Sequence, residues 1–263
     1  MKRNVAAIDI GSNSTNLLVV DAAGKDLVRQ VNVTALGEGV ERTGVLSPAA
    51  IERTLRVIEG YARITAEHDA ELHITGTAAC RMASNTAEFF ARVQTVAGSL
   101  PRVLSADDEA RLAWHGAVAS LPEIDGNTMV IDIGGASTEL TVGTPQSEVI
   151  ESVSMPFGVV TITEAELHGD PPRAEELSNA ISMVGDAVDN AAIERPLLGD
   201  AARVIGVAGS IVTIAAVELG LREFDSSRLH GMQLSKDAAE DVFRTLATER
   251  LADRVHNPGL PVE

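Results

Sequence analysis

The sequence predicts an α/β protein made of two duplicated domains with a cleft between them. Ile8–Leu17 aligns without gaps on Ile131–Leu140, at a constant offset of 123 residues, and seven of the ten residues are identical. In both copies an apolar run leads into an aspartate and a glycine turn, and an alternating segment follows. A repeat spaced by almost half of the 263 residues indicates two copies of one domain.

The first half of the sequence predicts three strands, a helix, a strand and further helices. Apolar alternation predicts a strand pair at 5–10 and 16–21 and a third strand at 27–36. Ser47 and Pro48 predict the start of a helix, because serine caps helices and proline suits the first helical position. The remaining predictions are a strand at 71–75, a helix from an Asn85–Glu88 capping box to about 97, a strand at 102–104 and a helix at 106–121.

Turn-forming residues at 122–127 separate the two halves and predict domains at 1–123 and 124–263. The second half repeats the pattern of the first. It predicts the second hairpin, a third strand at 148–153, a helix at 173–193, a strand at 203–207, an apolar helix at 211–221 and a final helix at 235–255. This order of elements fits two ribonuclease H-like domains.

The composition favours a globular protein that binds neither nucleic acid nor membrane. Hydrophobic residues make up 45% of the chain and charged residues 22%, which suffices for packed cores. The formal net charge of −17 opposes binding to nucleic acid and anionic membranes, and a highly anionic substrate would need metal ions or a locally basic cleft. The single cysteine excludes an internal disulfide, and no apolar run has the length of a membrane span. We therefore expect a cytoplasmic protein.

Each copy of the repeat contains a turn suited to phosphate. Glycines allow close approach of an anion and free the backbone φ angle, while N–H and hydroxyl groups supply donors. The strand-end aspartates need a cation or water beside them. One turn in each domain predicts a ligand clamped between them. The predicted phosphate-contacting residues are Gly11, Ser12, Asn13, Ser14, Arg81, Gly134, Gly135, Ala136, Ser137, Thr138, Gly209 and Ser210.

Asp132 and Glu139 are the predicted metal ligands of the second copy. They lie seven residues apart on the two strands of the hairpin, and a tight turn would offer both oxygens to Mg²⁺ or Mn²⁺. Asn16 replaces the glutamate in the first copy, so we expect chemistry at the second copy, with Asp9 assisting as a further ligand. The alternative for Glu139 is an exposed position on an edge strand.

Five segments in order resemble the exopolyphosphatase and guanosine pentaphosphatase family, within the actin, sugar kinase and heat-shock ATPase superfamily. They are residues 8–14, 76–85, 107–112, 132–139 and 154–158. The resemblance implies that Glu109 is the general base that activates water, and that Asp132 and Glu139 are the acidic catalytic pair. It also implies phosphate binding by Arg81.

Simpler structural interpretations stay open for several of these residues. Glu109 could be a helix-terminal glutamate favoured by the helix dipole, and Arg81 a surface arginine. Ser210 could be the N-cap of an ordinary strand-to-helix turn. Cys80 is expected to be a small buried hydrophobe, and Trp114 a core residue. Ala136 stands where the family has a third glycine, which would tighten the turn.

The reaction implied by the resemblance is release of terminal orthophosphate from inorganic polyphosphate by metal-assisted in-line hydrolysis. Guanosine pentaphosphate, the stringent-response nucleotide, has the same terminal phosphoanhydride, so its hydrolysis is an alternative. A phosphotransferase or nucleotide-binding protein of the superfamily is another. Longer family members carry an extra C-terminal helical domain, so we expect a preference for short chains here. The resemblance also implies homodimers and a second domain truncated at Glu263.

Overall fold

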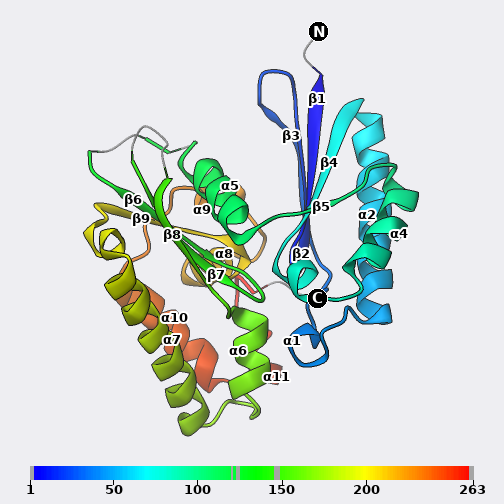
Figure 1. The fold of residues 1–263 in the computed structure, drawn as a ribbon. Helices are drawn as coiled ribbons and strands as arrows, with labels where there is room; N and C mark the ends of the chain where they lie inside the picture. The colour runs from blue at the N-terminus through cyan, green and yellow to red at the C-terminus, as the bar shows by residue number, and fades with distance from the viewer. Residues whose placement is uncertain (1–2, 120, 123–124, 145–148, 261–263) are drawn as a thin grey trace. The chain divides into compact units, whose positions relative to one another are not determined.

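The computed structural model describes residues 3–119, 121–122, 125–144 and 149–260, which form two compact units. Unit 1 runs to Glu109 and also includes Gly134–Ser137 and Pro156–Thr161. Unit 2 contains Ala110–Ile133, Thr138–Met155 and the chain from Ile162 onward. Each unit is built on a mixed sheet with helices, which confirms the predicted α/β class (Figure 1).

The sheet of unit 1 has the strand order β3-β2-β1-β4-β5. Strand β1 pairs antiparallel with β2 and parallel with β4. The strands are β1 (Asn4–Ile10), β2 (Ser14–Val20), β3 (Asp26–Val33), β4 (Ala70–Gly76) and β5 (Arg102–Val103). The helices are α1 (Val40–Thr43), α2 (Pro48–Glu67), α3 (Ala78–Met82) and α4 (Thr86–Ala97), and α5 (Ala106–Val118) leads into unit 2.

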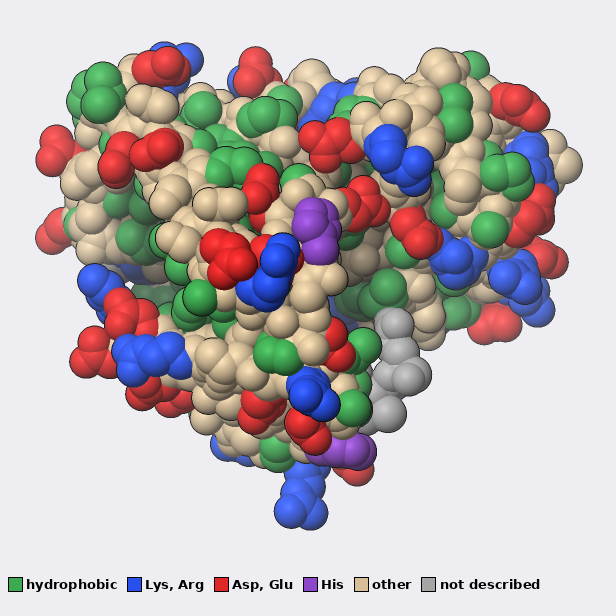
Figure 2. Space-filling view, turned by 90° about the horizontal axis from the view of Figure 1, so that it is seen from below, with side chains coloured by type: hydrophobic (Ala, Val, Ile, Leu, Met, Phe, Trp, Pro, Cys, Tyr) green, Lys and Arg blue, Asp and Glu red, His purple; other side chains and the backbone are tan. Residues whose placement is uncertain are grey.

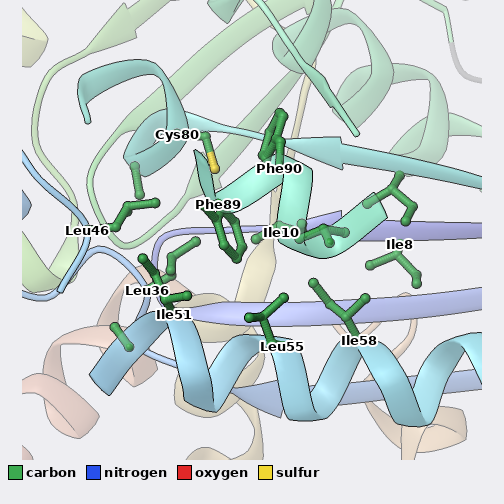
Figure 3. Packing of buried hydrophobic residues seen from close by; sticks show 14 of the residues in the cluster. Ile8, Ile10, Leu36, Leu46, Ile51, Leu55, Ile58, Cys80, Phe89 and Phe90 are labelled. Atoms are coloured by element: carbon green, nitrogen blue, oxygen red, sulfur yellow. The ribbon is translucent and has the colours of Figure 1, made fainter. Parts of the chain in front are cut away.

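Helices α2 and α4 pack on one face of this sheet and enclose the core (Figure 3). Ile51, Leu55 and Ile58 line one face of α2 and lie toward Ile8 and Ile10 of β1. Apolar residues spaced three and four apart share one side of a helix, which explains this packing. Helix α2 begins as predicted, with the Ser47 hydroxyl accepting a hydrogen bond from the Ala50 amide at 3.2 Å.

The described strands of unit 2 have the order β8-β7-β6-β9. Helix α8 packs on β6 and β9, and α10 packs on α8. The strands are β6 (Thr128–Ile133), β7 (Thr138–Gly143), β8 (Val149–Met155) and β9 (Arg203–Val207). The helices are α6 (Val159–Glu166), α7 (Ala174–Glu194), the 3-10 helix η1 (Pro196–Asp200), α8 (Ala208–Glu218), α9 (Ser226–Leu229), α10 (Lys236–Thr248) and α11 (Leu251–Arg254).

The duplication is accurate to the residue across three strands. Asp9 pairs with Asn16 between β1 and β2, and Asp132 pairs with Glu139 between β6 and β7, which keeps the offset of 123. The irregularity between Val19 and Val20 recurs between Val142 and Gly143 at the same offset. The repeat therefore extends well beyond the ten residues that revealed it in the sequence.

The boundary between the compact units differs from the predicted boundary between 123 and 124. The units divide at Glu109, because most of α5 packs in unit 2. Trp114 of α5 is buried there, as predicted for a core residue, and its indole N–H donates to the carbonyl oxygen of Thr128 at 3.3 Å. Residues 123 and 124 of the predicted linker lie outside the described residues.

Several local predictions were wrong. Asn85 makes no side-chain cap on α4, because its amide pairs with the backbone N–H and carbonyl of Leu46, at 2.8 and 3.0 Å. The predicted final helix is two helices, α10 and α11, since Glu249 and Arg250 have extended backbones. Helices α1, α3, α6 and α9 and the 3-10 helix η1 were not predicted.

No helix in the described part of the chain is long and apolar enough to cross a membrane. On the face shown in Figure 2, acidic and basic side chains are interspersed.

Candidate functional site

The two predicted phosphate turns close in the same way. The Gly11 amide donates to the carbonyl oxygen of Ser14 at 2.9 Å, and the Gly134 amide donates to that of Ser137 at 3.0 Å. None of Gly11, Gly134 and Gly135 has a positive φ, so the expected conformational role of these glycines was wrong. Their role is steric, because a Cβ on Gly11 would lie 2.8 Å from the Ser14 oxygen.

The carbonyl groups of both turns point into the protein. In the first turn, Ser12 O accepts from the Gly37 amide at 2.7 Å. In the second, Gly135 O accepts from the Val160 amide at 2.8 Å, and Gly134 O accepts from the Val159 amide at 3.0 Å. Gly37 and Val160 differ by the same 123 residues, so the support of the turns is duplicated as well.

The turns present backbone donors that no described protein group accepts. Within the described residues, the amides of Ser12, Asn13, Gly135 and Ala136 donate to no protein acceptor. Ser12, Gly135 and Ala136 are nevertheless buried. Buried N–H groups are nearly always paired, so these amides require water or an anion as a partner. Successive free amides of this kind form an anion-binding nest.

The two turns lie against each other within unit 1. A Cβ on Gly135 would lie 3.1 Å from the Asn13 amide nitrogen and 3.1 Å from the Ser12 Cβ. Side chains at this glycine would therefore separate the turns. The Ser12 side chain also has a structural role, because its hydroxyl oxygen accepts a hydrogen bond from the Ala79 backbone amide at 3.1 Å.

Asp132 and Glu139 stand directly opposite each other on β6 and β7. Directly opposed residues of an antiparallel pair project from the same face of the sheet. Glu139 is only 2% exposed, so the alternative interpretation of this residue, an exposed position on an edge strand, was wrong. Its Oε1 accepts a hydrogen bond from the Ser154 hydroxyl at 2.9 Å, which orients the carboxylate.

Asp9 occupies the same position in the first copy but has a different partner. The side-chain amide of Asn16 donates a hydrogen bond to Asp9 Oδ2 at 3.3 Å. Burial raises the pKa of Asp9 above its usual value, and hydrogen bonds from Asn16 and Thr75 oppose that rise. The first copy therefore pairs a carboxylate with an amide, where the second pairs two carboxylates.

Arg81 and Glu109 form an ion pair in unit 1. The Arg81 Nη1 donates to Glu109 Oε2 at 2.5 Å and to the Leu104 carbonyl oxygen at 3.1 Å. The side chains are 23% and 18% exposed, so Arg81 is not an ordinary surface arginine. Glu109 does lie in the first turn of α5, as the sequence predicted.

Gly209 and Ser210 lie inside the first turn of α8, whose N-cap is Val207. The alternative interpretation of Ser210 as the N-cap was therefore wrong. The Ser210 hydroxyl donates to the Ile133 carbonyl oxygen at 3.4 Å, at the end of β6. Ala208, just before them, has φ of 70°, a left-handed conformation that is rare for a residue with a side chain.

A model of the Ppx/GppA phosphatase family matches residues 18–250. The chain belongs to this family. Membership confirms the resemblance drawn from the motifs, and it makes the chain a phosphoanhydride hydrolase.

Relatives of known name agree with this assignment. Exopolyphosphatase 2 of Mycobacterium tuberculosis, in two strains, is 36% identical over 240 residues, which cover 86% of this chain and 74% of that protein. An exopolyphosphatase-like protein has a TM-score of 0.90 at 31% identity, covering 97% of this chain and 83% of its own. The Ppx/GppA family member of Aquifex aeolicus has a TM-score of 0.79 at 29% identity, covering 98% and 84%.

The predicted residues of this Ppx/GppA protein fall into two groups. Unit 1 contains Asp9, Arg81, Glu109 and both turns, at 11–14 and 134–137. Unit 2 contains Asp132, Thr138, Glu139, Gly209 and Ser210. Around the second turn the chain passes from unit 2 to unit 1 between Ile133 and Gly134, and returns to unit 2 between Ser137 and Thr138.

Gly158 was missed as a site residue, although it ended a quoted motif. A Cβ there would lie 2.3 Å from the Gly134 oxygen and 2.6 Å from the Gly135 carbonyl carbon. The residue therefore lets the start of α6 reach the second turn. A glycine directly after a proline and a phenylalanine indicates a turn, but the sequence does not show which backbone this turn contacts. The partner, at Gly134 and Gly135, lies more than twenty residues earlier.

Cys80 is a buried structural residue, as expected. Burial raises the pKa of its thiol to about 12; nearby Asp9 adds to the rise and Arg81 opposes it. A thiol with this pKa is protonated at neutral pH and is a poor nucleophile.

The residues fit a divalent cation in one place. Asp132 and Glu139 are opposed on β6 and β7, so both carboxylates project from the same face of the sheet. Mg²⁺ is commonly held by one or two carboxylates together with substrate phosphates, so Asp132 and Glu139 match its needs. Among the described residues, no group of three or more His, Cys, Asp and Glu side chains is arranged to hold a metal. The case for a metal therefore rests on this pair.

Proposed function

We propose that this chain is an exopolyphosphatase that releases terminal orthophosphate from inorganic polyphosphate. The observation that carries the proposal is the set of backbone amides at Ser12, Asn13, Gly135 and Ala136, which lack a protein acceptor within the described chain; all but Asn13 belong to buried residues. Family membership and the name of the Mycobacterium tuberculosis relative support polyphosphate as the anion.

The chain's own residues would act as follows. The free amides of the two turns bind oxygens of the terminal phosphoryl group and stabilise the charge that spreads over them in the transition state. Glu109 orients a water molecule and takes its proton as the water oxygen bonds to phosphorus. The bridging P–O bond then breaks, and its electrons remain on the shortened chain.

Asp132 and Glu139 would hold Mg²⁺ or Mn²⁺. Such an ion, when bound, neutralises phosphate charge during the transfer. The hydroxyl of Ser154 fixes the Glu139 carboxylate for this role. Asp9 remains the proposed assisting group of the first copy.

A phosphate-release assay tests the function and its metal requirement together. We expect release from polyphosphate with added Mg²⁺ or Mn²⁺, and loss of release after chelation with EDTA. Guanosine pentaphosphate and ATP are assayed in parallel at matched concentrations. Faster release from guanosine pentaphosphate than from polyphosphate of every length would show that the nucleotide is the preferred substrate. Equal release without metal would contradict the proposed role of a divalent cation.

We also propose a preference for short polyphosphate chains. Each added phosphate brings another negative charge toward a protein with a formal net charge of −17, so long chains experience more repulsion. Rates on defined lengths should fall as the chain grows, and the difference should narrow when salt screens the charges. Highest activity on the longest chains, at low salt, would contradict the preference.

A further inference from the structure

Arg81 is held where two strand ends meet. It lies on α3, directly after β4, and its amide donates to the Thr77 carbonyl oxygen at 3.0 Å. The end of β5 is joined to the end of β4, since the Leu104 amide donates to the Gly76 carbonyl oxygen at 2.9 Å. The Arg81 guanidinium therefore donates to a Leu104 carbonyl group whose backbone is held in place by the hydrogen bond to Gly76.

Glu109 is also fixed at its backbone. Its amide donates to the Ser105 carbonyl oxygen at 3.0 Å, in the first turn of α5, and the Asp108 amide donates to the Ser105 hydroxyl oxygen at 3.1 Å. The Glu109 side chain still has three rotatable bonds. The hydrogen bond from Arg81 Nη1 to its Oε2 restricts them.

One guanidinium nitrogen carries both bonds. Within the described chain, Arg81 Nη1 donates to Leu104 and Glu109, while Nε and Nη2 donate to no protein group. A planar guanidinium can hold the carboxylate with one edge and meet a phosphoryl oxygen with another. A lysine ammonium is a single point of charge and cannot keep the same fixed geometry.

We propose that Arg81 is a positioning residue that holds the Glu109 carboxylate in the orientation needed to activate water, a proposal that rests on the proposed role of Glu109. It differs from phosphate binding alone. A phosphate ligand acts on substrate affinity, whereas a positioning residue acts on the chemical step through its partner.

Arg81→Lys is the first test. Because misplacement of a reacting group by about 1 Å costs on the order of 10²-fold in rate, we expect kcat to fall about 10²-fold while KM changes only a few-fold. The matched control is Arg92→Lys. Arg92 pairs with Glu52 at 2.6 Å in the same unit, but the two side chains are 43% and 58% exposed, so turnover should not change. Unchanged kcat with a raised KM in Arg81→Lys would overturn the proposal.

A double-mutant comparison shows whether Arg81 acts through Glu109. In a Glu109→Gln background, measured under single-turnover conditions, adding Arg81→Lys should lower the rate no further. A full additional 10²-fold loss would mean that the two residues act independently, and would overturn the inference. Should Arg81→Lys not fold, Arg81→Gln carries the same expectations, because it removes the guanidinium that holds the Glu109 carboxylate.

The same variants separate this inference from the proposed function. Normal turnover by Glu109→Gln alone would show that Glu109 is not the general base, and Arg81 could then have no positioning role. An inactive Glu109→Gln variant together with normal kcat in Arg81→Lys would overturn only the role of Arg81.

Discussion

Glu109→Gln is expected to lower kcat for phosphate release by about 10²–10⁴-fold, the usual contribution of a general base. Glutamine keeps the size of the side chain and an oxygen that can accept from Arg81 Nη1, but it cannot take a proton from water. Substrate affinity should change little, because the proposed phosphate donors are backbone amides of the two turns. Phosphate release and equilibrium binding of polyphosphate measure the two effects separately.

Glu52→Gln is the matched control for this variant. Glu52 also accepts from an arginine, Arg92, but the pair lies on the surface, and exposed pairs contribute little. Its turnover and thermal stability should match those of the parent protein. Turnover of Glu109→Gln within a few-fold of the parent would show that this carboxylate is not the base.

Gly158→Ala is expected to damage both stability and activity. The added Cβ would lie 2.3 Å from the Gly134 oxygen, and neither group belongs to a flexible side chain. Overpacking of this kind typically costs about 1–3 kcal/mol of unfolding free energy. Because relief of the clash requires the 134–135 backbone to move, turnover of the folded fraction should fall on the order of 10²-fold.

Gly185→Ala is the matched control, because it is the same glycine-to-alanine substitution at a position without a steric clash. Gly185 lies inside α7, and a Cβ there meets nothing within 4 Å. Alanine in a helix interior should raise the unfolding free energy by roughly 0.5–1 kcal/mol, since glycine loses more backbone entropy on folding. Urea unfolding and phosphate release measure both variants. Parent-like stability and turnover in Gly158→Ala would show that the turn tolerates the displacement.

The sequence predicted the repeated hairpins well because their evidence is local. A strand pair joined by a short turn has its alternation, glycines and terminal aspartate within ten residues, and duplication gave a second reading of the same pattern. The pairing of Asp132 with Glu139 followed from that register. The helix start at Ser47 and Pro48 was equally local, since the cap and the helix it caps are adjacent.

The errors arose where a distant partner competed for a side chain or backbone group. Asn85 had the spacing of a capping box, but Leu46 offered it two backbone hydrogen bonds from another part of unit 1. Ser210 had the identity of an N-cap, but its hydroxyl donates to the distant carbonyl oxygen of Ile133, and α8 already begins at Ala208. Local propensity is a weak preference that such contacts override.

The amino-acid sequence by itself determined the duplicated α/β fold, the two glycine turns and the acidic residues beside them, because each is set by neighbours along the chain. Only the tertiary structure decided that Arg81 contacts Glu109, that Gly158 must lack a side chain, and that four turn amides have no protein acceptor among the described residues. Those features depend on which segments meet in space, and pairs separated by more than twenty residues leave little trace in local sequence patterns.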